Sequence, residues 1–184
     1  ILDSLTRVAH AARELALVLG ESGAARGYPP SALAAVTKLI ERAGNAASTG
    51  GAITGLYTVL AEGDDSNDPV VDTARAILDG HILLSRELAQ RGHYPAIDVP
   101  ASLSRVMDDL VPPETLEAAR RVRALISSRE ENRDLVLMGA YRAGSDPVLD
   151  EALQKTGAVD AFLQQRRGEG VSLPQSLGEL ADLI

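Results

Sequence analysis

The first residues whose types and spacing could do chemistry open the chain, where Ile1 and Leu2 precede Asp3 and a short polar segment leads to Arg7. An apolar strand that ends in aspartate and runs into a helix is how phosphate-binding nucleoside triphosphatases present a carboxylate to Mg²⁺. In that arrangement Arg7, just inside the helix, could reach the terminal phosphate. The same spacing fits an aspartate that caps the following helix, which is the simpler interpretation of this segment taken alone.

A second group of candidate residues lies between positions 92 and 106. Tyr94, beside Pro95, offers a flat face to a purine, and Arg105, on a polar turn, could project outward. Taken singly, Tyr94 also fits ordinary packing and Arg105 a solvated charge. The acidic segment 62–68 could bind Mg²⁺ or Ca²⁺, but it lacks the ligand spacing of an EF-hand, so we expect helix capping and surface solvation there.

The positions of the two lysines exclude a phosphate-loop motif from this sequence. The phosphate loop, Gly-x-x-x-x-Gly-Lys-Ser/Thr, cradles phosphates with backbone N–H groups and a lysine. The chain has only two lysines: Lys38 is followed by leucine, and Lys155 is followed by threonine but lacks the preceding glycines. The sequence therefore contains no phosphate loop. If the chain belongs to a nucleoside triphosphatase, we expect that loop upstream of Ile1.

Composition excludes several classes of protein and site. The chain has 184 residues and a formal charge of −8, which argues against a nucleic-acid partner. With no cysteine, it can form neither a disulfide framework nor a thiolate zinc site nor a cysteine nucleophile. His81 and His93 have no matching ligand pattern, so we expect structural roles for both. No apolar run approaches membrane-spanning length, and the opening lacks the form of a signal peptide.

The elements that must position these residues follow from hydrophobic periodicity. Helical spacing predicts helices over 6–19, over 31–43 with Ser31 as N-cap, over 70–78 and over 86–91. Residues 52–61 are predicted to form a buried strand, 81–85 a short strand and 94–99 an extended segment. Beyond Pro112 and Pro113 the chain is helical almost throughout. We therefore expect an α/β layer with parallel pairing over 1–111 and a helical domain over 112–184.

Taken as continuous strings, much of the chain resembles the flagellar type III export ATPases. Leu-Asp-Ser-Leu-Thr-Arg at 2–7 and Gly-His-Tyr-Pro-Ala-Ile-Asp at 92–98 are typical, and the other matching strings lie at 26–31, 39–44, 57–65, 67–69, 74–82 and 102–107. The wider family includes injectisome ATPases and the catalytic subunits of rotary ATP synthases. Segments 132–136 and 139–147 look more like the flagellar branch.

The resemblance implies a fold and an activity. The fold is the second half of a RecA-like parallel-sheet nucleotide-binding domain, followed by a small C-terminal helical bundle. The activity is that of a ring-forming ATPase whose full-length form hydrolyses ATP with Mg²⁺ to energise flagellar protein export, and this chain alone is expected to be inactive. The alternatives are an injectisome secretion ATPase and a non-catalytic docking fragment or paralogue.

The resemblance implies specific roles for five residues, four of which were already candidates from the local sequence. Asp3 matches the carboxylate that holds Mg²⁺ through water, and Arg7 an arginine near the terminal phosphate. Tyr94 and Phe162 match the adenine pocket, and Arg105 matches an arginine finger that acts in trans on the adjacent subunit. Removing such a finger costs about 10³–10⁵ in rate. The family's catalytic glutamate is expected upstream of Ile1.

The resemblance also implies partners and a location. We expect a homo-hexamer whose loop from Tyr141 to Pro147 meets a coiled-coil stalk protein. Further partners would be a stator protein, the export gate, export substrates and their chaperones. The ring would be cytoplasmic and peripheral at the inner membrane, without entering it and without binding nucleic acid.

Overall fold

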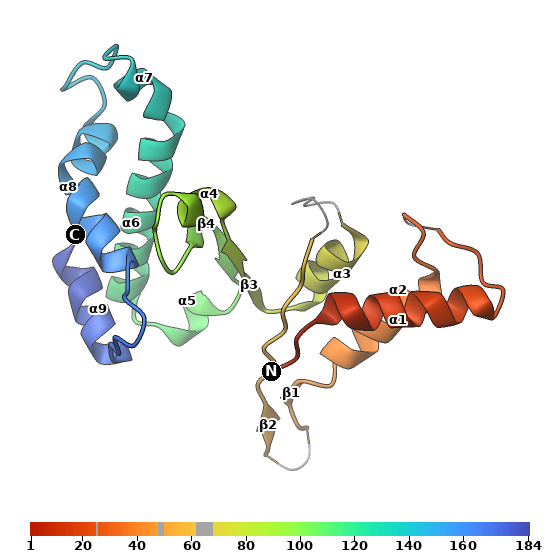
Figure 1. Ribbon diagram of the computed structural model, residues 1–184. Helices are drawn as coiled ribbons and strands as arrows, with labels where there is room; N and C mark the ends of the chain where they lie inside the picture. The colour runs from red at the N-terminus through yellow and green to blue at the C-terminus, as the bar shows by residue number, and fades with distance from the viewer. Residues whose placement is uncertain (25, 48–49, 62–67) are drawn as a thin grey trace. The chain divides into compact units, whose positions relative to one another are not determined.

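The structure is a computed structural model that describes residues 1–24, 26–47, 50–61 and 68–184 (Figure 1). The chain divides into two compact units, Ile1–Asp79 and Gly80–Ile184. The acidic segment weighed as a cation site lies outside the described residues except for Asp68. The boundary predicted near Val111 falls inside the second unit, between two of its helices.

Helices supply the apolar core of the first unit: α1 (Leu5–Val18), α2 (Pro30–Ile40) and α3 (Pro69–Ile77). Helix α1 packs along α2, and α2 also packs against α3 (Figure 1). The core residues recur at helical spacing on the facing sides, as expected for amphipathic helices. They are Leu5, Ala9, Ala32, Val36, Ile40, Val70 and Ala74, and Tyr28 joins them from the segment before α2.

Short polar side chains start two of these helices. The Oγ of Ser4 accepts a hydrogen bond from the backbone N–H of Arg7 at 3.4 Å at the start of α1. The Asp68 carboxylate accepts from the N–H groups of Val70 (2.8 Å) and Val71 (3.2 Å) at the start of α3. Each bond satisfies an N–H group that has no partner within its helix. The capping expected of the acidic segment is confirmed at Asp68.

The N-cap predicted at Ser31 is wrong. Helix α2 begins at Pro30 with Pro29 as its cap, because a proline at the first helical position needs no hydrogen-bond partner for its nitrogen. Ser31 instead lies inside the first turn, where its N–H donates to the Glu21 carboxylate at 3.1 Å.

The strands of the first unit are short. Strand β1 (Gly44–Asn45) pairs antiparallel with β2 (Ala52–Ile53). Leu2 pairs in parallel with Tyr57, and Thr58 N–H donates to the Leu2 carbonyl at 3.1 Å. The strand end predicted at Ile1 and Leu2 is found only as this isolated bridge, which is parallel. The parallel pairing expected over 1–111 is otherwise not seen in the described residues, because the two sheets there, β1 with β2 and Gly80–Leu84 with Ile97–Ser104, are both antiparallel.

The buried strand predicted over 52–61 is wrong for most of its length. Regular pairing covers only Ala52 and Ile53 and resumes as a bridge at Tyr57. Ile53, Leu56 and Leu60 are each more than half exposed. Within the part of the chain that the structure describes, this segment pairs only with Leu2 and with β1, so its apolar side chains have few neighbours to cover them.

The second unit opens with a hairpin of antiparallel strands, β3 (Gly80–Leu84) and β4 (Ile97–Ser104). Helix α4 (Arg86–Gln90) lies between them in sequence, capped by the Ser85 hydroxyl, which accepts from Leu88 N–H at 3.3 Å. The strand and helix predicted over 81–91 are confirmed. A short helix, α5 (Met107–Leu110), follows β4.

The remaining helices are α6 (Pro113–Glu131), α7 (Arg133–Leu137), α8 (Pro147–Leu163) and α9 (Leu173–Asp182). Helix α6 packs against α8 and α9, which confirms the predicted helical bundle (Figure 1). Val122, Ile126 and Val159 form its buried centre, and Val99 of β4 packs against them. Because hairpin and bundle share this apolar centre, they belong to one compact unit.

Lys155 ties α8 to the end of α9. Its ammonium group donates to the carbonyl oxygens of Leu183 (2.7 Å) and Ile184 (3.2 Å) and pairs with Glu151 at 3.2 Å. A cation at a helix C-terminus also interacts favourably with the helix dipole.

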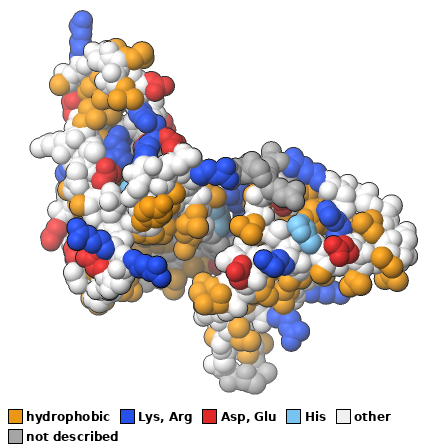
Figure 2. Space-filling model, viewed as in Figure 1, with side chains coloured by type: hydrophobic (Ala, Val, Ile, Leu, Met, Phe, Trp, Pro, Cys, Tyr) orange, Lys and Arg blue, Asp and Glu red, His pale blue; other side chains and the backbone are white. Residues whose placement is uncertain are grey.

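Hydrophobic side chains also reach the surface (Figure 2). In the first unit they include Val18 and Leu19 at the end of α1, and in the second Ile82 and Leu84 on β3. Exposed apolar side chains gathered on one element are typical of contact surfaces. Among the described helices, none is both long and apolar enough to cross a bilayer.

Candidate functional site

Asp3 lies where the Leu2 bridge ends and α1 is about to begin. Its Oδ1 accepts a hydrogen bond from the Thr58 hydroxyl at 2.6 Å, and its side chain is exposed. The neighbouring Ser4, rather than Asp3, caps α1. The helix-cap interpretation of Asp3 is therefore wrong, and its carboxylate stands at the carboxyl end of a parallel pair.

This geometry fits a carboxylate that holds Mg²⁺ through water. One oxygen is fixed by Thr58, and the side chain is open to solvent. No group of three or more acidic or histidine side chains in the described ranges is arranged to hold a metal ion. A water-mediated role needs only one protein carboxylate here, because Mg²⁺ keeps several waters and takes further oxygens from substrate phosphates.

Arg7 lies in the first turn of α1 with an exposed side chain. Its backbone N–H donates to the Ser4 hydroxyl, which caps α1. Asp3 therefore lies just before this cap and Arg7 just after it. Both residues thus lie at the N-terminal end of α1. Thr58, which orients Asp3, was missed by the sequence analysis because the two residues are 55 positions apart.

Tyr94 lies in the loop between α4 and β4, with more than half of its side chain exposed. Its carbonyl oxygen accepts a hydrogen bond from the N–H of Gln165, just beyond α8, at 2.9 Å. Tyr94, Arg166 and Arg167 line an open hollow of about 1040 Å³. This hollow presents an aromatic face beside cationic side chains.

Phe162, in the last turn of α8, lines a neighbouring hollow of about 340 Å³. Pro95, Ala161, Gln164, Gln165 and Glu169 line both hollows. The structure thus brings the two residues predicted to form an adenine pocket to adjoining surfaces of one unit, although they are 68 positions apart in the sequence.

Arg105 follows β4 directly, in a bend before α5, and its side chain is exposed. It belongs to the same unit as Tyr94 and Phe162 but lines neither of their hollows. Asp3 and Arg7 belong to the other unit. The five predicted residues therefore fall into a pair at the start of α1, a pair around the hollows and a separate arginine.

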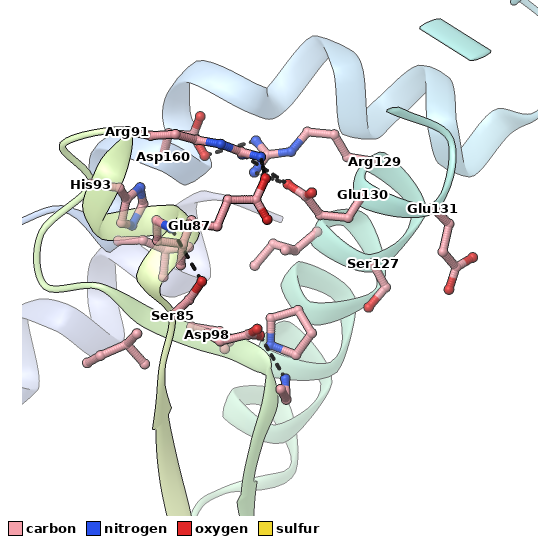
Figure 3. Close-up of a pocket in the computed structure, with 17 residues that line it drawn as sticks. Ser85, Glu87, Arg91, His93, Asp98, Ser127, Arg129, Glu130, Glu131 and Asp160 are labelled. Atoms are coloured by element: carbon pink, nitrogen blue, oxygen red, sulfur yellow. Dashed lines mark hydrogen bonds and ion pairs between the residues drawn. The ribbon is translucent and has the colours of Figure 1, made fainter. Parts of the chain in front are cut away.

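A further cavity in the second unit, of about 490 Å³, was not predicted from the sequence (Figure 3). Leu88, Ile97, Val99, Ile126 and Leu163 contribute apolar side chains to its lining. Figure 3 shows Arg91 and Arg129 beside carboxylates contributed by α4, α6 and α8.

Ion pairs join the elements around this cavity. Glu87 of α4 pairs with Arg91, and with Arg133 of α7 at 2.9 Å. Arg91 also lies 3.9 Å from Glu130, which lies 3.8 Å from Arg129. A further pair joins Arg129 of α6 to Asp160 of α8 at 2.9 Å. The Glu87–Arg91 spacing of four was the one signal of this network that the sequence offered.

Glu87 is the shared acid of two of these pairs. Hydrogen bonds from Arg91 first and Arg133 second hold the pKa of its carboxyl below the ordinary value of 4.5. Glu87 therefore stays ionised to a lower pH than an ordinary glutamate, and both arginines keep their charged partner over that range.

The loop from Tyr141 to Pro147 is held by the start of α8. The Tyr141 hydroxyl donates to Asp150 at 2.8 Å, and Gly144 N–H donates to the same carboxylate at 2.8 Å. Burial, with help from Asp150, raises the pKa of Tyr141 above 10.0, so the phenol remains a donor. Asp146 caps α8 through Val148 N–H at 2.8 Å, and Arg142 is exposed at the tip.

Comparison with known proteins identifies the family. Residues 1–104 match the nucleotide-binding domain of the ATP synthase alpha/beta family, and residues 111–182 match the C-terminal domain of the type III secretion ATPase EscN. The chain belongs to the ATP synthase alpha/beta family. The predicted fold class, half of a RecA-like nucleotide-binding domain followed by a helical domain, is confirmed by these matches.

Individual relatives place the chain within that family. It is 52% identical, over all of its length, to a flagellum-specific ATP synthase from Pseudomonas aeruginosa, of which it covers 41%. It is 54% identical to a protein of the same name from Salmonella typhimurium, of which it covers 40%. A type 3 secretion system ATPase from Pseudomonas syringae pv. syringae is 48% identical, with 40% of its length covered.

Solved structures of type III secretion ATPases match this chain over nearly all of its length. The assembled ATPase EscN from the enteropathogenic E. coli type III secretion system matches 98% of this chain with a TM-score of 0.94 and 42% identity. EscN in complex with its central stalk EscO matches the same share with a TM-score of 0.87 and 40% identity. The chain covers 43% and 42% of those two chains, so it spans about two fifths of the relatives it resembles.

Proposed function

We propose that this chain is the C-terminal part of a ring-forming ATPase that hydrolyses ATP to energise flagellar type III protein export. The observation that carries the proposal is the match, in one continuous order, of a nucleotide-binding domain and a type III secretion ATPase domain. Identities to flagellar relatives (41% to 54%) overlap those to secretion relatives (47% to 51%), and the flagellar branch is proposed on the two flagellar relatives at 52% and 54%.

The residues around the start of α1 would serve the phosphates. Bound Mg²⁺ would neutralise charge that develops on the transferred phosphoryl group. Asp3 would orient the waters around that ion, with Thr58 holding its carboxylate in place. Arg7, on the first turn of α1, would contact the terminal phosphate.

The residues of the second unit would serve the base and the neighbouring subunit. Tyr94 and Phe162 would enclose the adenine ring, because aromatic faces bind bases by stacking and by excluding water. Arg105, exposed just beyond β4, would reach the nucleotide of the adjacent subunit as an arginine finger. The phosphate loop and the catalytic glutamate would come from residues outside this sequence.

Assembly and partners are part of the same proposal. A homo-hexamer is supported by the likeness to the assembled ATPase EscN and by the exposed apolar side chains at the end of α1 and on β3. The loop from Tyr141 to Pro147, fixed by Asp150 and exposing Arg142, would contact a coiled-coil stalk. A stator protein, the export gate, substrates and chaperones would complete the apparatus, on the cytoplasmic side of the inner membrane.

Replacement of the proposed finger tests the function in the full-length protein. Arg105→Ala should lower kcat for ATP hydrolysis by about 10³-fold or more and leave nucleotide affinity nearly unchanged, because the finger acts on the transition state. Steady-state hydrolysis and equilibrium binding of ATP to the same preparation measure the two effects. Arg120→Ala is the matched control, since Arg120 makes an exposed ion pair with Asp108 on the same unit.

Two outcomes would contradict the proposal. If hydrolysis and binding fell together, Arg105 would be a ligand within its own subunit or a structural residue. If the unaltered full-length protein hydrolysed no ATP, the alternative of a non-catalytic docking paralogue would stand. An injectisome ATPase would instead be indicated if the full-length protein restored secretion, but not motility, to strains that lack their own ATPase.

A further inference from the structure

The position of Tyr94 is set by its backbone rather than by the packing of its ring. The side chain is 57% exposed, so few neighbours constrain it. The loop that carries it runs from the end of α4 to the start of β4. Whatever holds that loop therefore decides where the aromatic face lies.

Backbone hydrogen bonds close this loop on itself. His93 N–H donates to the Leu88 carbonyl at 3.0 Å, and Ser85 N–H donates to Ala96 at 2.8 Å. These bonds fix the shape of the segment and join it to α4. They do not by themselves fix the segment against the helical bundle.

Contacts with the bundle supply that second constraint. The Gln165 N–H holds the Tyr94 carbonyl at 2.9 Å. At the other side of the segment, Glu87 pairs with Arg133 of α7 at 2.9 Å, and Arg91 approaches Glu130 of α6 at 3.9 Å. Figure 3 shows Glu87 and Arg91 directed from α4 toward the carboxylate of Glu130.

We propose that the ion pairs of Glu87 and Arg91 with α6 and α7 position Tyr94 for the adenine base. Glu87, Arg91, Glu130 and Arg133 are then positioning residues, which act through α4 and touch no nucleotide. The inference rests on the proposed ATPase function and assigns to that function a set of residues beyond the pocket itself.

The expected consequence is selective for the base. The phosphates are proposed to bind the start of α1 and residues outside this sequence, whereas Tyr94 contacts only the adenine ring. Loss of one of these ion pairs should weaken the binding of every ligand that carries the base. It should leave unchanged the binding of a ligand that consists of phosphate alone. A structural role elsewhere in the protein would not separate these two kinds of ligand.

The experiment compares Arg133→Ala with the unaltered full-length enzyme. We expect KM for ATP to rise about two- to fivefold, the range expected for loss of an exposed ion pair, with kcat nearly unchanged. The inhibition constant of ADP should rise in parallel, and that of pyrophosphate should stay the same. Arg133→Lys, which keeps the charge opposite Glu87, should restore most of the affinity for ATP and ADP.

Control variants and opposing results make the proposal falsifiable. Arg120→Ala removes an exposed ion pair that does not touch α4 and should change none of these constants. The proposal is overturned if Arg133→Ala weakens pyrophosphate as much as ADP, if only kcat falls, or if Arg133→Lys behaves like Arg133→Ala. Absence of ATP hydrolysis in the unaltered enzyme would defeat the proposed function instead, which is a different result.

Discussion

The carboxylate of Asp3 is oriented by a single hydroxyl group. Thr58 donates to it at 2.6 Å, while the Thr58 backbone N–H donates to the carbonyl of Leu2 at 3.1 Å. One residue thus holds both the strand end and the side chain at its tip. A carboxylate restricted in this way loses less conformational freedom when it arranges waters around a cation.

Removing that hydroxyl should affect the dependence on Mg²⁺. In the full-length protein, Thr58→Val should raise the Mg²⁺ concentration for half-maximal hydrolysis by about tenfold, the lower end of the loss expected for an outer-shell partner of a metal site. Titration of activity with Mg²⁺ at saturating ATP measures this. Thr58→Ser keeps the hydroxyl and should behave like the unaltered protein, and equal effects of both variants would contradict the role given to the hydrogen bond.

For individual residues, the sequence was enough to select candidate site residues, but it did not predict which distant residues contact each other. Asp3, Tyr94 and Arg105 could be selected as candidates from the local sequence, since Asp3 follows an apolar pair, Tyr94 stands beside Pro95 and Arg105 lies on a polar turn. Thr58 could not, because its meeting with Asp3 depends on the register between Leu2 and Tyr57. The link from Arg133 to Glu87 spans 46 positions and depends in the same way on how α7 lies against α4.

Among the elements, the start of α8 has two tasks. Asp146 caps the helix, and Asp150, one turn later, fixes the preceding loop through Tyr141 and Gly144. The Asp146 carboxylate thus accepts hydrogen bonds from the helix, and the Asp150 carboxylate accepts them from the loop. These bonds restrain the loop, and such a restraint would lower the entropic cost of the proposed contact with a stalk.

The cap can be tested by stability. Asp146→Ala should lower the free energy of unfolding by about 1 kcal/mol, because two N–H groups of α8 lose their acceptor. Asp146→Asn retains an oxygen in the same place and should cost clearly less. Chemical denaturation of both variants measures the difference, and an equal loss in both would assign the effect to the charge rather than to the hydrogen bonds.

Helices were predicted more accurately than strands. A helix such as α1 satisfies its own backbone and shows its buried face in its periodicity, so local sequence suffices. The segment 52–61 has the composition of a buried strand, but strands become buried only when partners cover them. Ser31 was misjudged for a local reason, since Pro30 beside it can occupy the first helical position without a hydrogen bond.

For the whole molecule, the five candidate residues are divided between two units, and none of the nucleotide-binding motifs with a lysine is present. The order of the two domains was predicted from the resemblance, since matching strings run along the entire chain. The division at Asp79 was not, because it depends on Val99 packing against the helical bundle.

The 184-residue chain alone should therefore show no measurable ATP turnover. The phosphate loop contributes most of the phosphate contacts in this class of enzyme, and the sequence has none. A steady-state phosphate-release assay on the purified chain, beside the full-length protein as positive control, measures this. Robust hydrolysis by the chain that persisted after repeated purification would contradict the proposal that the phosphate loop and the catalytic glutamate come from residues outside this sequence.

Lys155 gives the chain an unusual chemical property. Its amine is engaged by Glu151 and by two carbonyl oxygens at the end of α9, whereas the only other lysine, Lys38, lies on α2 of the first unit. Its contacts with the Leu183 and Ile184 carbonyls are lost when α9 separates from α8, so an acylating reagent should reach the Lys155 amine more readily in the opened form. The rate of acylation at Lys155 should therefore rise in variants that weaken the packing of α9 against the rest of its unit.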